Sequence, residues 1–403
     1  MILLRNIQIG LFVGIILISI VIGFGVFTFP NPPSTDLESS GPPESSGPPE
    51  SSSPSESINE QDTNRSLNLT KGINYTFFNG TAWKFSELSG NILSGGVPKD
   101  GIPPIENPKY VTGSEAASYL SATDIVFGLD YQGAVIAFPQ YILVLHEIVN
   151  EEFSDVKITL SYCPLTGSAV GFKGHFLTIE TTFGVSGKLL NSNLVMYDRD
   201  SDSYWPQILG MSVQGDHINQ DLETVQLFWT TWGQWYDLYP ETQVLSEDTG
   251  FLRNYGSDPY GDYNYDNNYY KSGGPFFPVM TSNSILTDKT VVYGVSLNES
   301  YLAIEKNALM NTKVLNVNIS NQNIVVFYDN QLDVARVYNS NIGDQIYTFK
   351  YENGNFVDVN TGSEWNIEGT SSIGSLEPIV YFDVMWFAWY AFHPDTTLIY
   401  WVN

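Results

Sequence analysis

Cysteine and positive charge are both scarce in this sequence. Its 403 residues include 17 Lys or Arg against 44 Asp or Glu, so the formal net charge is −27. Nucleic-acid binding depends on clustered basic side chains that neutralise phosphates, and the composition therefore argues against a nucleic-acid partner. The single cysteine, Cys163, excludes an intramolecular disulfide and the zinc motifs that need several cysteines. The sequence also lacks the HExxH, GxSxG and phosphate-loop patterns.

Long apolar runs are rare too, and the one that stands out lies at the N-terminus. Residues 7–29 carry no charge, and at about 1.5 Å per residue a helix of this length crosses a bilayer. Arg5 precedes the run and the first acidic residues follow it, so residues 1–6 are expected in the cytoplasm. A cleaved signal peptide is the alternative. The pattern predicts a single-pass protein of the cell membrane with its C-terminal domain outside.

Residues 30–82 have the composition of a linker. The block SSGPPE occurs at 39–44 and again at 45–50, and such Pro/Ser/Gly-rich sequence cannot bury a core. A disordered, glycosylated stalk is therefore expected between the anchor and the domain. The glycosylation sequons, four of them crowded into this region, are at Asn64, Asn68, Asn74, Asn79, Asn298 and Asn318.

The remainder, residues 83–403, consists of short apolar runs separated by Gly, Asn, Asp and Pro. This pattern predicts a mostly β, α+β domain. We expect strands at 125–129, 134–138, 158–162, 177–182, 291–295, 323–328 and 345–351. Helical spacing is found only at 114–120, 142–149, 228–239 and 385–392.

Two stretches of the domain repeat one another in order. Val126-Phe-Gly128 matches Val292-Tyr-Gly294, and the run 158–162 matches 324–328 at the same separation, 292 − 126 = 166. Further along, Trp205 and Trp365 occur in similar blocks and are expected in equivalent settings. These matches predict two tandem internal repeats, unit one at about 123–246 and unit two at about 290–403, joined by a loop at 247–289.

Several blocks closely resemble the DUF3179 family. They are GIPPIENPKYV (101–111), HEIVN (146–150), YCPLTGSA (162–169), SGKLLNSNLVMYDR (186–199), YGSDPY (255–260), TGSEWNIEG (361–369) and WFAWYAFHPDT (386–396). The resemblance runs from about residue 95 to the C-terminus. It implies an exported domain and no established activity. Members often carry a second cysteine in the YCPLC-type turn, where this sequence has Thr166.

A metal or thiol site in unit one is the first functional hypothesis. The position of Cys163 in unit one is matched by Asp329 in unit two, and His146 has no histidine counterpart there, so both residues are peculiar to unit one. Thiolate and imidazole ligands suit copper or zinc, and Met196 or His175 could complete the set. The structural alternative is a buried cysteine that ends a strand and a hydrogen-bonded core histidine.

A nucleophilic site is a second interpretation of the same residues. Cys163 would attack, His146 would act as base, and Glu147 or Asn150 would orient the imidazole. Lys188 could then hold a substrate anion. Pro164 directly after the thiol argues against a helix N-terminus that would lower its pKa strongly.

Acidic and aromatic residues suggest a function without catalysis. The turn Asp198-Arg-Asp200-Ser-Asp202 offers oxygen ligands, with calcium a weaker candidate than copper or zinc, but it does not match an EF-hand. The Tyr-rich segment 260–270 could stack on sugars. The alternative function is therefore a non-catalytic cell-surface module that recognises a glycan, the cell envelope or a protein partner.

Overall fold

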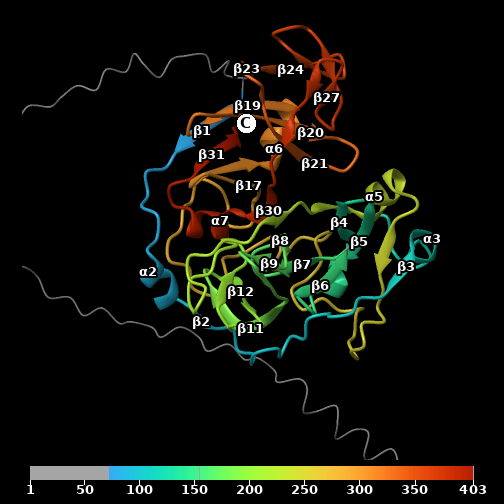
Figure 1. Ribbon diagram of the computed structural model, residues 1–403, viewed down its shortest axis with the longest axis vertical. Helices are drawn as coiled ribbons and strands as arrows, with labels where there is room; N and C mark the ends of the chain where they lie inside the picture. The colour runs from blue at the N-terminus through green and yellow to red at the C-terminus, as the bar shows by residue number, and fades with distance from the viewer. Residues whose placement is uncertain (1–71, 154, 403) are drawn as a thin grey trace, which may run out of the picture. The chain divides into compact units, whose positions relative to one another are not determined.

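The computed structural model describes residues 72–153 and 155–402, and this part of the chain is mostly β (Figure 1). The predicted fold class, β-rich with few helices, is confirmed. The predicted membrane segment 7–29 and most of the stalk lie outside the described residues. Within 72–153 and 155–402, none of the helices has the length and apolar character needed to span a bilayer.

The described part of the first half contains three sheets of four or five strands and the two-stranded sheet β10-β9. One has the strand order β15-β4-β5-β16-β3, the second β14-β8-β7-β6, and the third β13-β12-β11-β2. Its strands are β2 (Leu93–Ser94), β3 (Tyr110–Thr112), β4 (Ile125–Tyr131), β5 (Ala134–Pro139), β6 (Ile148–Phe153), β7 (Val156–Cys163), β8 (Ser168–Lys173), β9 (His175–Phe176), β10 (Ile179–Glu180), β11 (Phe183–Leu190), β12 (Asn193–Asp198), β13 (Tyr204–Pro206), β14 (Thr224–Val225), β15 (Phe228–Thr231) and β16 (Gln243–Leu245). Its helices are α2 (Phe85–Gly90), α3 (Gly113–Ala116), α4 (Gln140–Leu143) and α5 (Trp232–Leu238).

The second half arranges its strands in a matching way. Its larger sheets have the orders β30-β17-β18-β31-β1, β29-β21-β20-β19 and β26-β25-β24, and β22-β23 and β27-β28 form two-stranded sheets. The strands are β1 (Ile73–Phe77), β17 (Val291–Leu297), β18 (Ser300–Glu305), β19 (Val314–Ile319), β20 (Gln322–Asp329), β21 (Val334–Asn339), β22 (Asn341–Ile342), β23 (Gln345–Ile346), β24 (Phe349–Glu352), β25 (Asn355–Asp358), β26 (Glu364–Trp365), β27 (Thr370–Ser371), β28 (Gly374–Ser375), β29 (Glu377–Pro378), β30 (Phe382–Met385) and β31 (Thr397–Trp401). Its helices are α6 (Lys306–Thr312) and α7 (Trp386–Phe392).

Tryptophan contacts agree between the halves in detail. The Trp205 indole N–H donates to Asp198 over 2.9 Å, and the Trp365 indole N–H donates to Asp358 over 3.0 Å, each pair seven residues apart. On the helices, Trp235 donates to Thr242 over 3.0 Å and Trp389 to Thr396 over 2.9 Å. Each helix tryptophan also packs on a glycine of the neighbouring strand, where an added Cβ would lie only 2.0 Å from Trp235 at Gly128 and 2.3 Å from Trp389 at Gly294.

The domain begins earlier than the sequence suggested. In Figure 1 β1, in blue, lies beside β31, in red, and the two strands pair antiparallel from Ile73 with Trp401 to Phe77 with Thr397. Ile73 is buried in the core of the second half. The predicted linker, residues 30–82, therefore includes a strand of the folded domain. The sequence did not reveal this strand because a single short strand beside a polar stalk is recognisable only through its pairing partner, which lies at the other end of the chain.

Some predicted elements are wrong in type or length. The expected helix at 142–149 is α4, which ends at Leu143, followed by a turn and β6; the positive φ of 58° at Glu147 is incompatible with a helix continuing through that residue. The expected helix at 228–239 starts with strand β15, whose last residue, Thr231, caps α5 by accepting a hydrogen bond from Gln234 N. The helix at 114–120 is shortened to the four-residue α3.

Two predicted strands are interrupted. Residues 177–182 contain only the two-residue strand β10, since Leu177 adopts a positive φ of 53° in the turn before it. Residues 345–351 are divided between β23 and β24. The other predicted strands lie within β4, β5, β7, β17 and β20, and α7 occupies the fourth predicted helix.

Candidate functional site

Cys163 ends β7 inside the main core. Its side chain is 1% exposed, and its sulfur accepts a hydrogen bond from Leu194 N at 3.3 Å. Burial, and next the charge of Glu147, raise the pKa of this thiol to about 11. Cys163 is therefore a neutral thiol at physiological pH, which is the opposite of the lowered pKa that an activated cysteine nucleophile needs.

His146 is fully buried and both of its ring nitrogens have partners. Nδ1 lies 2.8 Å from the carbonyl oxygen of Pro103, and Nε2 lies 2.7 Å from the hydroxyl of Tyr255. Burial lowers the pKa of the imidazole, so the neutral form is favoured. A metal held by both His146 and Cys163 would have to displace these hydrogen bonds. The predicted copper or zinc site stays a prediction.

Glu147 lies close enough to Cys163 for its charge to raise the pKa of the thiol, but the His146 imidazole, which the nucleophile hypothesis expected Glu147 to orient, contacts Pro103 and Tyr255 instead. Glu147 is 7% exposed, its carboxyl group makes no hydrogen bond to the described residues, and burial raises its pKa to about 8. Asn150 has a structural role, because its amide donates to the Phe183 carbonyl at 2.8 Å and accepts from Thr159 at 2.7 Å. Met196 is fully buried in the same core cluster as Cys163.

The remaining predicted residues are more peripheral. Lys188 on β11 and His175 on β9 are both half-buried. The structure assigns no charged partner to Lys188 within the described part of the chain. Within the described residues, neither Lys188 nor His175 makes a hydrogen bond or ion pair with Cys163 or His146, so the structure does not assemble them into one site.

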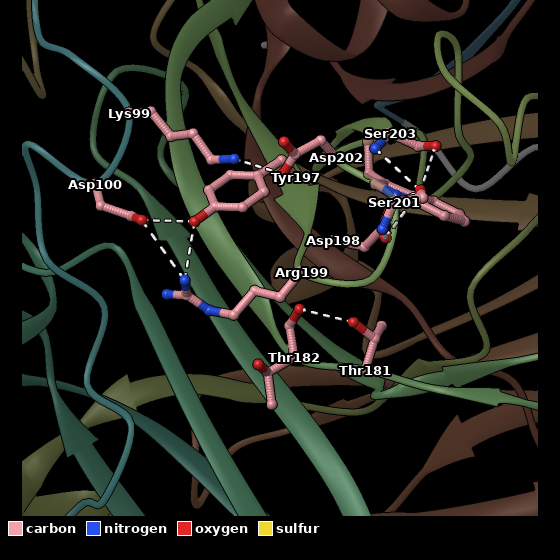
Figure 2. A network of polar contacts seen from close by, with 11 residues as sticks. Lys99, Asp100, Thr181, Thr182, Tyr197, Asp198, Arg199, Ser201, Asp202 and Ser203 are labelled. Atoms are coloured by element: carbon pink, nitrogen blue, oxygen red, sulfur yellow. Dashed lines mark hydrogen bonds and ion pairs between the residues drawn. The ribbon is translucent and has the colours of Figure 1, made fainter.

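Figure 2 shows the acidic turn after β12 and the polar network beside it. Asp198 accepts hydrogen bonds from Ser201 N at 2.6 Å and from the Trp205 indole, whereas the Asp202 carboxylate points away and pairs with Lys99. In the same view the Tyr197 hydroxyl donates to Asp100 at 2.5 Å and accepts from Arg199 at 2.9 Å. The predicted oxygen set Asp198, Asp200 and Asp202 is therefore not assembled around one point.

A different group of ligands meets at this turn. Asp198, Asp200 and His217 bring their donor atoms within 4.8 Å of one another. Nε2 of His217 makes no hydrogen bond to the described residues and lies 3.6 Å from Asp200. The second half has the same turn: Asp358 likewise accepts hydrogen bonds from Thr361 N at 2.6 Å and from the Trp365 indole. It lacks counterparts of the other two ligands. Asp198 thus has a structural role that explains its position without a metal.

A cleft of about 300 Å³ lies at the junction of the two halves, where β15 approaches β30. We call it the junction cleft. The segment between the halves contributes Tyr263, Asn264 and Lys271. Residues of the two halves line it in equivalent pairs, each taken from matching strands or turns: Ile125 with Val291, Gly167 with Asp333, Trp229 with Asp383, and Thr231 with Met385.

Asp383 is the most unusual side chain of the junction cleft. It is 5% exposed, and its carboxyl group makes no hydrogen bond or ion pair with the described residues. Burial raises its pKa to about 7, with a further rise from Asp333 and an opposing effect of Lys306. Lys306 itself pairs with Asp333 at 2.9 Å. The cleft thus holds one buried carboxyl group without a partner beside a compensated ion pair.

Aromatic rings form the opposite wall. Trp229 meets Tyr263 edge-on with ring centroids 5.2 Å apart, and Tyr263 stacks on Tyr270 at 3.9 Å. The Tyr263 hydroxyl lies 3.0 Å from that of Tyr162, the residue before Cys163. Thr166, in the turn after Cys163, accepts a hydrogen bond from Met385 N at 2.9 Å through its carbonyl. Residues of the YCPLTG turn therefore contact two of the residues that line the cleft, Tyr263 and Met385.

A family model described as "Protein of unknown function (DUF3179)" matches residues 99–396. The chain belongs to the DUF3179 family. No curated protein and no solved structure matches it. The matched span of this DUF3179 chain includes most of both halves, every residue lining the junction cleft, and the predicted residues His146 and Cys163.

Sequence reasoning singled out the segment 260–270, which contributes Tyr263 and Asn264 to the junction cleft, but missed the other cleft residues of the DUF3179 domain. The candidate residues were sought among those peculiar to unit one, whereas Trp229 and Asp383 occupy matching strands of the two halves. Sequence reasoning also missed Lys289, whose ammonium nitrogen is buried, lies 3.2 Å from the Tyr269 ring centre and has no hydrogen-bond partner among the described residues. Burial lowers the pKa of Lys289 to about 7. The available signal was a difference of side chain at equivalent positions, Trp in one half and Asp in the other.

Proposed function

We propose that this DUF3179 protein is a membrane-anchored, extracellular binding domain whose junction cleft takes a small polar ligand. The observation that carries the proposal is Asp383, a buried carboxyl group that lines the cleft and has no protein partner. Because no side chain of the described residues donates to this carboxyl group, a ligand that supplies a donor would add a hydrogen bond that the protein itself does not make. The anchor at 7–29 and the stalk complete the proposed arrangement.

The architecture supports a binding role. We propose that the two halves are tandem copies of one unit, and ligand sites commonly form at such junctions with a few convergent polar groups. A bound molecule would place an apolar face on Trp229 and Tyr263 and offer a hydroxyl or amino group to Asp383. Lys271, on the rim, could donate to an acceptor on the ligand.

The exported location has support from the sequons on the surface. Asn74, Asn79, Asn298 and Asn318 are all exposed, as glycosylation requires. Asn298 also lies in the tight turn between β17 and β18. The metal or thiol site at His146 and Cys163 has less support, because the donor atoms of both residues already have hydrogen-bond partners.

The proposal is tested by ligand screening on the full-length protein in detergent. Neutral sugars, polyols and amino sugars would be titrated while tryptophan fluorescence is followed, since Trp229 lines the cleft. A ligand that binds wild type and loses at least tenfold in affinity with Asp383→Asn supports the proposal. The matched control is Glu377→Gln, an exposed carboxylate on β29 that should leave affinity unchanged. Equal binding by wild type and Asp383→Asn would overturn it.

A further inference from the structure

We infer that the junction cleft is one end of a longer groove that binds an oligosaccharide chain without acidic groups. This inference rests on the proposed function and names its ligand class. Two more hollows continue from the cleft along the first half. The middle hollow, about 450 Å³, shares Ile125, Tyr263 and Asn264 with the junction cleft. The outer hollow, about 590 Å³, shares Asp124, Tyr141, Tyr255 and Gly256 with the middle one.

Tyrosines and carboxylates dominate the walls of these two hollows. The rings come from Tyr119, Tyr141, Tyr255 and Tyr263. The acids are Asp124, Glu247, Asp258 and Asp262, and no Lys or Arg lines either hollow. Aromatic faces stack on the apolar faces of sugar rings, and carboxylates accept hydrogen bonds from sugar hydroxyls or amino groups. The same carboxylates would repel uronic-acid, sulfated or phosphorylated chains.

Tyr141 supplies an unfilled hydrogen-bonding position in the groove. Its hydroxyl is buried and has no hydrogen-bond partner within 3.5 Å among the described residues, although the Glu247 carboxylate lies near enough to interact with it, and the residue lines both hollows. Its ring meets that of Tyr255 edge-on, with centroids 6.4 Å apart. Asp383 at one end and Tyr141 further along are therefore two separate polar groups in one continuous depression, and neither makes a hydrogen bond of normal length with the described residues. A single monosaccharide could satisfy only one of them, whereas a chain could reach both.

The wall of the groove is held in place by residues of the family motifs. His146 contacts the Tyr255 hydroxyl at 2.7 Å, and the same hydroxyl lies 2.6 Å from Thr249. On the floor, the Gln140 amide donates to Asp258 at 2.9 Å and to the Tyr162 hydroxyl at 3.2 Å. Buried, hydrogen-bonded supports of this kind fix the orientation of a binding surface before the ligand arrives.

Calorimetric titration of the full-length protein tests the inference. The probes are hexamers and dimers of cellulose, chitin and chitosan fragments and of maltodextrin, with a galacturonate hexamer as the acidic probe. We expect at least one non-acidic hexamer to bind at least tenfold more tightly than its own dimer, and the galacturonate hexamer to bind at least tenfold more weakly than that hexamer. Hexamer and dimer of equal affinity, or tighter binding of the acidic chain, would overturn the inference.

Variants separate the groove from the cleft. Tyr119→Ala, at a residue 47% exposed on the outer hollow, should weaken the hexamer at least fivefold and leave the dimer unchanged. Tyr141→Phe, which removes only the hydroxyl, should act in the same direction. Asp383→Asn should weaken both probes. If no saccharide binds but a non-carbohydrate ligand still depends on Asp383, the groove inference is wrong and the proposed function stands; if no ligand depends on Asp383, both fail.

Discussion

Trp229 and Asp383 occupy equivalent positions in the two halves and face the same cleft. Trp229 pairs with Phe127 on β4, and Asp383 pairs with Tyr293 on β17 in the matching register. One half therefore supplies an aromatic surface and the other a carboxyl group from the same place in the fold. This difference turns a near-symmetric junction into an asymmetric one that can orient a ligand.

Asp383 should make stability depend on pH. Because its pKa is raised to about 7 in the folded protein, the folded state holds a proton that the unfolded chain has released above pH about 4. The contribution of the protonated Asp383 carboxyl group to the free energy of unfolding is fully present below pH 4 and is lost as pH rises through 7. Asp383→Asn should therefore stabilise the protein at pH 8, by up to roughly 4 kcal/mol, and have little effect at pH 4.

Chemical denaturation of both proteins at the two pH values measures this effect. The matched control is Glu377→Gln, whose carboxylate is exposed and should give no pH-dependent difference. An Asp383→Asn variant that is less stable than wild type at pH 8 would show that the carboxylate has a stabilising partner in the folded protein.

Gly128 and Gly294 should be equally intolerant of a side chain. An added Cβ would lie 2.0 Å from Trp235 at the first and 2.3 Å from Trp389 at the second, so each tryptophan would have to move within a packed core. We expect Gly128→Ala and Gly294→Ala each to cost about 3 kcal/mol or more. Thermal unfolding by circular dichroism provides the measurement. Gly90→Ala, where the added Cβ meets nothing within 4 Å, is the control, and similar losses at all three glycines would refute the packing argument.

The thiol of Cys163 should be unreactive in the native protein. It is buried and its pKa is raised to about 11, so both access and thiolate fraction are low. An aromatic disulfide reagent should label it within minutes only after denaturation, and because it is the single cysteine the absorbance reports this residue alone. Rapid labelling under native conditions would instead favour the predicted thiol chemistry.

Divalent cations should have little effect on stability. Asp198 is already hydrogen-bonded as Asp358 is, and the Asp200 side chain is 53% exposed. We therefore expect chelator, zinc or manganese to change the melting temperature by no more than about 1 °C, since only a bound ion stabilises the folded state. A larger rise in wild type that disappears in Asp200→Asn and in His217→Ala would establish a metal site at this turn. Asn360→Asp, at the matching position of the second half, is the control for added charge.

The sequence alone determined the β-rich class and the paired blocks of the two halves. Both signals are local: alternation of apolar residues predicts a strand within a few positions, and the Trp205–Asp198 and Trp365–Asp358 contacts span seven residues. Local spacing failed where backbone conformation changed abruptly, as at Glu147, whose positive φ replaced a predicted helix by a turn and strand β6.

Only the tertiary structure decided which side chains face one another. His146 bonds to residues 43 and 109 positions away, and its side chain and that of Cys163 turn to different partners although they belong to adjoining motifs. The junction cleft brings Trp229 and Asp383 together from strands of separate sheets. Neither spacing nor composition predicts such contacts between residues far apart in the sequence, because they depend on how complete sheets pack. The site proposed for this chain was therefore recognised from the fold and not from its motifs.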